Sequence, residues 1–158
     1  MMAAVDLGVP LLVHLPNKDW VSQEDAARLA AVGTKILMTI GFGAPVFGVF
    51  AHDNEPRFRD GKPWPESIVD GVGTGEEAGY AMVNARTLFD AGAIVGYCTD
   101  TTYDALAGLE HELKSMNVVF SMQDMVQIMG PNTAAYLGME NELGTLSAGK
   151  LADIVLLD

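Results

Sequence analysis

Short apolar runs alternate along this chain with longer segments of helical periodicity. Two runs, at residues 10–15 and 93–97, are apolar almost throughout, which is typical of parallel strands buried on both faces. Residues 34–40 are the strand candidate between them. Between and after them, apolar residues recur every three or four positions, as on one face of a helix. The helices predicted in this way lie between residues 22 and 33 and at 76–91, 103–116, 121–129 and 132–137. Strands that alternate with helices predict an α/β architecture with a parallel sheet, which suits an open doubly wound sheet and a barrel fragment equally well.

Several residues mark the ends of the predicted helices. Ser22 and Ser121 are good N-cap residues, because their hydroxyls can accept hydrogen bonds from the first helical N–H groups. Gly33 and Gly138 are expected to end helices, since glycine adopts the left-handed conformation that follows a last turn. Gly130-Pro131 is expected to break the chain between the last two helices.

Residues 41–75 form a long segment that is rich in glycine and proline and lacks helical periodicity. Loops of this length inside compact domains are usually functional or disordered, and the aromatic residues of this one favour an ordered loop. Arg57 and Arg59 give it two guanidinium groups that could bind a substrate carboxylate as part of a lid. The alternative is that they form surface ion pairs with the neighbouring acidic residues.

Composition narrows the class of protein. The net charge is −12, with only nine Lys and Arg among 158 residues, which disfavours nucleic acid and anionic membranes as partners. Cys98 is the only cysteine, so no internal disulfide is possible. No apolar run reaches the length of a membrane span, and the first residues lack the features of a signal peptide, so a cytoplasmic location is expected. Residues 1–7 resemble the end of a helix, which leaves open that the chain begins inside a larger parent.

Two candidate metal ligands follow predicted parallel strands. His14 stands near the end of the first strand and Asp100 just after the third, so both are expected at the same rim of the sheet. Imidazole and carboxylate both bind Zn²⁺, and an ion held there would lower the pKa of its water while a carboxylate took the proton. Taken alone, His14 could equally be a hydrogen-bonded structural residue, and Asp100 a cap for a helix or turn.

Two motifs stand out in the C-terminal half: residues 144–155 read Gly-x-Leu-x-x-Gly-Lys-x-Ala-Asp-Ile-Val, and residues 96–100 read Gly-x-x-Thr-Asp. They resemble the closing signature and the strand-8 motif of the amidohydrolase superfamily, metal-dependent hydrolases built on a (β/α)8 barrel. Residues 109–113 and 132–138 are similar to the two helices that follow. Residues 12–14 resemble the strand-5 histidine segment. The similarity is strongest over residues 85–158 and points to the imidazolonepropionase-like and prolidase-like branch.

The resemblance implies a fold and a role for each candidate residue. Residues 1–138 would be part of a TIM-type barrel, with about its last four βα units, and residues 139–158 would return to a small composite β-domain through a strand at 152–157. In the family, the aspartate that matches Asp100 binds the metal and acts as general base, and the histidine that matches His14 is a metal ligand. A divalent metal, Zn²⁺ by preference, is therefore expected.

Departures from the family pattern leave this metal site incomplete. The family's strand-1 His-x-His pair belongs to a segment outside this sequence, and its strand-4 Lys or Glu is absent too. The expected histidine at the end of residues 34–40 is missing, and His52 is either a replacement ligand or an exposed loop residue. Catalytic zinc sites usually have three protein ligands and a water. The chain alone is therefore predicted to be inactive.

The leading hypothesis is a fragment of a metal-dependent amidohydrolase that cleaves C–N bonds in a small-molecule substrate, such as a cyclic amide or a dipeptide-like compound. A whole barrel needs about 250 residues, and a partial one leaves two sheet edges open, so a missing N-terminal half or a second copy of the chain is expected to complete it. A non-catalytic oligomeric α/β protein of the same descent and a small-molecule-binding α/β module are the alternatives.

Overall fold

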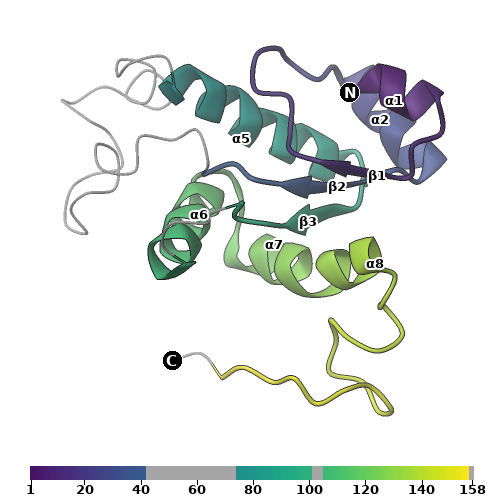
Figure 1. Cartoon of the computed structure of the whole chain (residues 1–158), viewed down its shortest axis with the longest axis vertical. Helices are drawn as coiled ribbons and strands as arrows, with labels where there is room; N and C mark the ends of the chain where they lie inside the picture. Colours follow the sequence, from purple (N-terminus) through teal and green to yellow (C-terminus); the bar gives the residue numbers. More distant parts are fainter. Residues whose placement is uncertain (42–73, 101–104, 157–158) are drawn as a thin grey trace.

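Three parallel strands form the sheet of this protein. The structure is a computed structural model that describes residues 1–41, 74–100 and 105–156. In it, β1 (Leu11–Val13), β2 (Lys35–Met38) and β3 (Val95–Tyr97) lie in the order β1-β2-β3 (Figure 1). Both pairings are parallel, as the sequence predicted. The described residues thus contain three strands, whereas the sequence predicted about four βα units.

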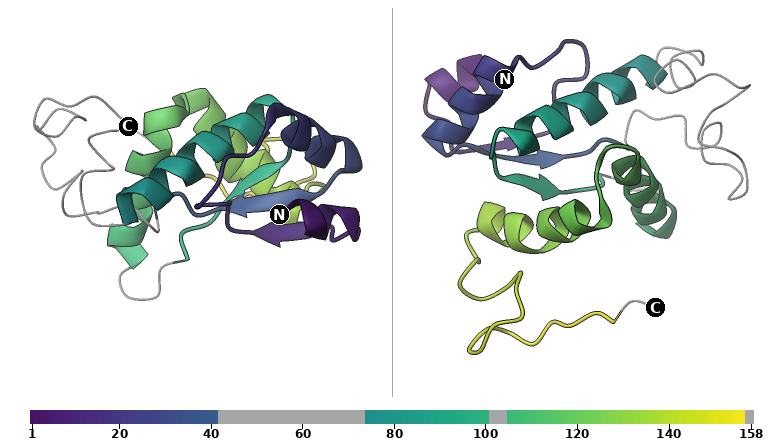
Figure 2. Two further views of the ribbon diagram at one scale, coloured as in Figure 1. Left: turned by 90° about the horizontal axis from the view of Figure 1, so that it is seen from above. Right: turned by 180° about the vertical axis from the view of Figure 1, so that it is seen from behind.

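Helices surround this sheet on several sides. Their bounds are α1 Met2–Asp6, α2 Gln23–Val32, α5 Thr74–Asp90, α6 Ala105–Val119, α7 Met122–Gln127, the π-helical η1 Ile128–Asn132, and α8 Thr133–Leu137. Figure 1 shows α1 and α2 at the β1 side of the sheet and α7 and α8 next to β3. Seen from behind, α5 crosses over the sheet (Figure 2). None of the helices in the described ranges is both long and apolar enough to cross a membrane.

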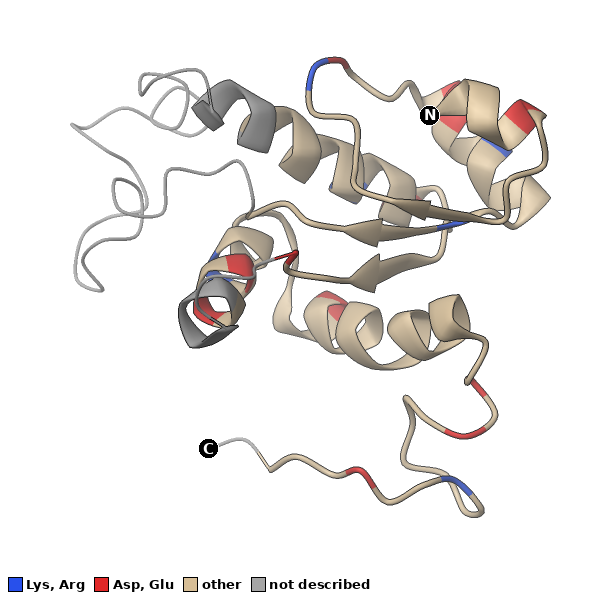
Figure 3. Ribbon diagram, in the orientation of Figure 1, with Lys and Arg blue, Asp and Glu red and all other residues tan. Residues whose placement is uncertain are grey.

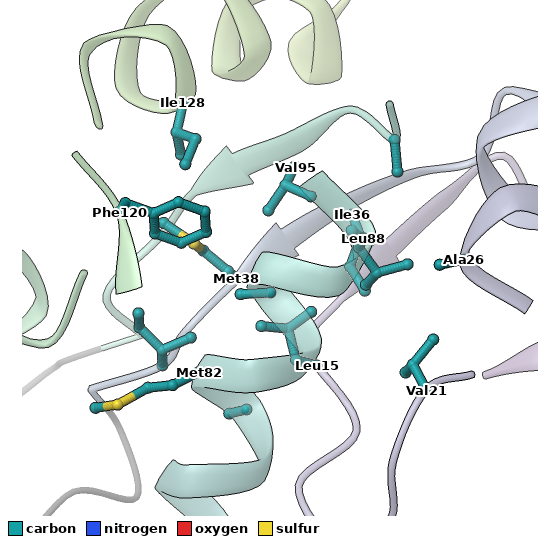
Figure 4. Close-up of a cluster of buried hydrophobic side chains, with 14 of the residues drawn as sticks. Leu15, Val21, Ala26, Ile36, Met38, Met82, Leu88, Val95, Phe120 and Ile128 are labelled. Atoms are coloured by element: carbon teal, nitrogen blue, oxygen red, sulfur yellow. The ribbon is translucent and has the colours of Figure 1, made fainter. Parts of the chain in front are cut away.

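The hydrophobic core centres on the sheet and α5, and it extends to buried residues of α2, α6, α7 and η1. Ile36 and Met38 on alternate positions of β2 are fully buried, and so are Met82 and Leu88 on α5 (Figure 4). By contrast, Leu11 and Val13 of β1 are 43% and 52% exposed. The prediction that the first strand is buried on both faces is therefore wrong. The reason is that β1 is an edge strand, and the described parts of the chain leave one of its faces uncovered.

The predicted helix caps are confirmed. The hydroxyl of Ser22 accepts a hydrogen bond of 3.0 Å from the backbone N–H of Asp25. Ser121 forms a capping box with Asp124, in which each side chain accepts from the other residue's backbone N–H. Gly138 ends α8 in the left-handed conformation with φ of 71°.

The predicted chain break at Gly130-Pro131 is wrong, because both residues lie inside η1 and helical structure runs on from α7 to α8. Proline has no N–H to donate, and the wider π-helical turn accommodates it by shifting the hydrogen-bonding pattern locally. The carbonyl of Ile128 accepts from the backbone N–H of Thr133, five residues later, and from the hydroxyl of Thr133 at 2.8 Å. This wider hydrogen-bonding pattern carries the helix past Pro131.

The strand predicted at residues 152–157 is not formed over its described part. Residues 151–156 have no strand partner, and Ile154, Val155 and Leu156 are 61%, 80% and 94% exposed. In Figure 1 this segment lies apart from the sheet, beyond α7 and α8. A strand needs a neighbour to satisfy its backbone groups, and no partner for this one lies in the described parts of the chain.

Three residues singled out from the sequence, His52, Arg57 and Arg59, lie outside the described residues. The ordered loop predicted at residues 41–75 also lies outside the described residues from 42 to 73, and α5 begins at Thr74.

Candidate functional site

His14 and Asp100 meet at the C-terminal rim of the sheet. His14 follows β1 directly, and Asp100 lies three residues after the end of β3. The Nε2 atom of His14 is 3.6 Å from Oδ2 of Asp100, and each side chain is about half exposed. The structure therefore brings together the two candidate ligands that the sequence placed at one rim.

Both residues have an unusual backbone conformation. His14 has φ of 65° and Asp100 has φ of 52°, and they are the only residues other than glycine with positive φ in the described ranges. Such a conformation is uncommon for residues with a side chain, although His and Asp adopt it more readily than most, and it clusters at functional sites, where the surrounding structure holds it in place. Here it occurs at both residues of the candidate pair.

Thr39 orients the imidazole ring of His14. Its hydroxyl lies 2.8 Å from Nδ1 of His14, and Thr39 itself is buried just beyond the end of β2. With Nδ1 engaged by Thr39, the ring presents Nε2 to Asp100. Thr39 was not singled out from the sequence, because a threonine at the end of an apolar run carries no signal of contact with a residue 25 positions away.

The geometry of the pair is compatible with two ligands of a single divalent cation. Two atoms that each lie about 2.0–2.2 Å from a tetrahedral zinc ion are separated by roughly 3.4 Å. The separation of 3.6 Å between Nε2 of His14 and Oδ2 of Asp100 is close to that value. Among the described residues, no cluster of three or more His, Cys, Asp or Glu side chains could hold a metal ion, so the pair supplies part of a ligand set.

Asn84 of α5 fixes the loop that follows His14. This side chain is fully buried, and its amide nitrogen donates to the carbonyls of Pro16 and Asp19 at 2.8 and 2.9 Å. Its amide oxygen accepts from the backbone N–H of Val21 at 2.8 Å. Three hydrogen bonds from one buried amide thus tie the loop between β1 and α2 to the core helix.

Glu112 of α6 holds the chain where it leaves β2. Its two carboxylate oxygens accept hydrogen bonds from the backbone N–H groups of Ile40 and Gly41, at 2.9 and 2.6 Å. Burial raises the pKa of Glu112 from 4.5 to about 8, and the two backbone hydrogen bonds oppose that rise. A Cβ atom on Gly41 would lie 2.6 Å from Oε2 of Glu112, so this close approach requires glycine.

Residues at the junction of η1 and α8 cover the outer edge of β3. The amide of Asn132 donates to the carbonyl of Val95 at 3.0 Å, and the backbone N–H of Tyr97 donates to the hydroxyl of Thr133 at 2.9 Å. The sequence predicted that a partial barrel would leave two sheet edges open. At the β3 edge that expectation is wrong, because side chains replace a neighbouring strand.

Sequence reasoning missed Asn84 and Glu112 as well as Thr39. A polar residue on the apolar side of a helix is a usable signal, and Asn84 stands between Met82 and Ala85, which are both buried. Acidic residues are scattered over α1, α2, α6 and the C-terminal segment (Figure 3), so charge alone does not distinguish Glu112.

Comparison with known proteins decides the family. Residues 78–158, about half of the chain, match the sequence profile of the amidohydrolase family. The chain belongs to this family. The imidazolonepropionase of Rubrobacter xylanophilus is 37% identical to this amidohydrolase chain over 78 residues. That stretch is 47% of this chain and 19% of the relative, so the chain matches about a fifth of that protein's length.

Solved structures share the fold of this amidohydrolase chain. The crystal structure of another amidohydrolase gives a TM-score of 0.65 at 22% identity and covers 94% of this chain. A prolidase complexed with N-methylphosphonate-L-proline gives 0.64 at 18% identity and covers 95%. In both cases the match spans 33% of the solved chain. The chain thus corresponds in fold to about a third of these larger proteins.

Proposed function

We propose that this chain is the C-terminal part of the (β/α)8 barrel of a metal-dependent amidohydrolase that hydrolyses amide or cyclic amide C–N bonds. The observation that carries the proposal is the pairing of His14 and Asp100. Their side chains converge at 3.6 Å on the C-terminal rim of a parallel sheet, which is where barrel enzymes carry their reactive groups. Family membership and the shared fold support the same conclusion.

Within this proposal, His14 and Asp100 are the protein's contribution to a divalent metal site, with Zn²⁺ as the expected ion. A bound ion of this kind lowers the pKa of a water molecule so that it can attack a carbonyl group near neutral pH. Asp100 is the general base, because its carboxylate is half exposed and can accept the proton from that water. Thr39 orients His14, and Asn84 and Glu112 fix the loop and strand end around the pair.

The remaining site residues named from the sequence stay predictions. His52 is proposed as a third ligand, and Arg57 and Arg59 as donors to a substrate carboxylate. The proposed location is the cytoplasm. Because the chain supplies two ligands in its described part and spans a third of its structural relatives, we propose that it is inactive alone and needs further barrel units, from an N-terminal half or a second copy.

Equilibrium dialysis against Zn²⁺, followed by an assay with a simple amide and an X-Pro dipeptide, tests the proposal. Saturable binding of about one ion per chain is expected, and Asp100→Asn should lose it. Asp153→Asn, which changes an exposed acid on the C-terminal segment, is the matched control and should bind as the parent does. A parent chain without saturable binding would contradict the proposed function. Turnover that disappears in Asp100→Asn would contradict the proposed inactivity of the chain alone.

A further inference from the structure

Thr39 occupies a fixed position between two structural constraints. It follows Met38, the last residue of β2, and precedes Ile40 and Gly41, whose N–H groups are both held by the buried carboxyl of Glu112. Thr39 is itself only 7% exposed. Its hydroxyl oxygen therefore has little freedom to move, while the ring of His14 in front of it is half exposed. The contact of 2.8 Å between them is set by the strand end more than by the histidine.

A neutral imidazole has one nitrogen that donates and one that accepts, and the partner of one nitrogen decides the role of the other. A threonine hydroxyl can act as either donor or acceptor, because it has one O–H and two lone pairs. Opposite Nδ1 of His14, it can thus support both forms of the ring. With the proton on Nε2, the ring faces Asp100 as a donor. With the proton on Nδ1, the ring presents a lone pair at Nε2.

We propose that Thr39 is the positioning residue that makes Nε2, and not Nδ1, the nitrogen that His14 offers to a divalent cation shared with Asp100. The proposal rests on the metal site argued above and adds which nitrogen is used and which residue fixes that choice. The hydroxyl of Thr39 donates to Nδ1 when no ion is bound and accepts from Nδ1–H when Nε2 binds the ion. In this exchange Nε2 releases its proton to solvent and Nδ1 takes one from solvent, so the number of protons on the ring does not change.

Three variants separate this role from a merely structural one. Thr39→Val keeps the shape of the side chain but removes the hydroxyl, and Thr39→Ser restores a hydroxyl on a smaller side chain. Thr87→Val is the matched control, because the hydroxyl of Thr87 donates to the carbonyl of Val83 within α5 and makes no contact with His14. Thr39→Ala provides a second hydroxyl-free variant if Thr39→Val does not fold.

The measurement is a two-bond ¹H–¹⁵N correlation spectrum of ¹⁵N-histidine-labelled full chain, recorded without metal and with Zn²⁺. In the parent, Nδ1 of His14 should be unprotonated without metal and protonated with Zn²⁺, with Nε2 as the nitrogen whose signal the ion shifts. Thr39→Val should move the metal-free Nδ1 signal. It should also weaken Zn²⁺ binding about tenfold, because loss of a residue that hydrogen-bonds a metal-binding histidine typically lowers metal affinity by at least this factor. Thr39→Ser and Thr87→Val should behave as the parent does.

Two results would overturn the proposal. One is a metal-free Nδ1 signal that is the same in Thr39→Val and the parent, and the other is Zn²⁺ bound through Nδ1 in the parent. If no variant binds Zn²⁺, the metal-site proposal fails, but the metal-free Nδ1 signals still decide whether Thr39 orients His14. The two proposals therefore fail in distinguishable ways.

Discussion

His14 and Asp100 follow strands that are not neighbours in the sheet, yet Nε2 of one lies 3.6 Å from Oδ2 of the other. The strand between them, β2, brings Thr39 to the same rim, where its hydroxyl contacts the imidazole of His14. Both members of the pair have positive φ, which turns the chain at the point where each strand ends. The rim is thus built from a strained backbone that presents two metal-binding side chains.

Glycine and alanine variants of His14 and Asp100 should reveal how much the positive φ of these residues costs in stability. The free energy of unfolding of His14→Gly should be about 1 kcal/mol higher than that of His14→Ala. The glycine variant is the more stable one, because glycine adopts positive φ without the steric cost that alanine has. Asp100→Gly and Asp100→Ala should differ in the same direction. Urea denaturation followed by circular dichroism measures the difference.

The control for backbone strain is Val13, the neighbour of His14, which lies in β1 and has no positive φ. There the order should reverse, with Val13→Gly less stable than Val13→Ala by roughly 0.5–1 kcal/mol, because glycine loses more conformational entropy on folding. Equal stability of glycine and alanine variants at both His14 and Asp100 would show that the left-handed conformations are not maintained in solution.

Asn84 should be among the most sensitive polar residues of the chain. Asn84→Ala removes three hydrogen bonds of a buried amide and leaves the carbonyls of Pro16 and Asp19 without this donor. We expect a loss of about 2–4 kcal/mol in the free energy of unfolding. Asn141→Ala, which alters an exposed asparagine, should change it by less than about 0.5 kcal/mol. Similar losses in the two variants would argue against Asn84 as an anchor for the loop.

Glu112 should make the protein less stable as the pH rises. Its pKa is raised by burial from 4.5 to about 8, so between these values the folded chain binds a proton that the unfolded chain releases. This contribution to stability is fully present below about pH 4.5 and is lost as the pH rises through about 8. Burying the charged form costs on the order of 5 kcal/mol across that window. Tyr97 does not contribute there, because burial raises its pKa to about 12.

Urea denaturation of the parent and of Glu112→Gln at pH 5, 6, 7 and 8 checks this prediction. The free energy of unfolding should fall with pH in the parent and change much less in the variant. Glu110→Gln, on the same helix but exposed and paired with Lys114, should keep the slope of the parent. A parent whose stability rises from pH 5 to pH 8 would contradict the assignment to Glu112.

Arg86 joins α5 to the N-terminus of α7, and lysine should not replace it. Its guanidinium donates to Asp90 and Asp124, and it also lies 5.8 Å from the ring centroids of Phe89 and Phe120. The hydrogen bond to Asp90 is the main cause of a raised pKa for Arg86. A lysine ammonium cannot make this forked and stacked set of contacts, so Arg86→Lys should lose about 1 kcal/mol of stability.

Arg28→Lys is the comparison for this prediction. Arg28 pairs with Asp6 across α2 and α1, both side chains are about half exposed, and a lysine can keep a single ion pair there. Its change in unfolding free energy should lie within about 0.5 kcal/mol. If thermal unfolding shows the same small effect for both substitutions, the contacts of Arg86 contribute no more than an ordinary surface pair.

Local signals in the sequence were sufficient to predict the three strands and the N-caps of two helices. The apolar runs placed the three strands, and Ser22 and Ser121 cap helices as predicted, because these features depend on residues close together in the chain. The break expected at Pro131 was wrong, since a π-helical turn over Ile128–Asn132 compensates for the missing N–H by a local change in the hydrogen-bonding pattern. That compensation depends on geometry that the presence of a proline does not reveal.

His14 and Asp100 could be predicted from the sequence, but the residues that hold them in place could not. His14 and Asp100 follow parallel strands, and parallel strand ends meet at one edge of a sheet. The contacts from Thr39, Asn84 and Glu112 join residues 25 to 72 positions apart, and no local pattern encodes them. The strand predicted near the C-terminus needs a partner that the described residues do not supply.

A double-mutant cycle on Zn²⁺ affinity, measured by isothermal titration calorimetry, tests the central claim most directly. The four proteins are the parent, His14→Asn, Asp100→Asn and the double variant. If the two side chains share one ion, each single substitution should weaken binding almost as much as both together, and the coupling free energy should exceed about 1 kcal/mol. Additive losses, or affinities that stay at the parent value in both single variants, would contradict a shared metal site at His14 and Asp100.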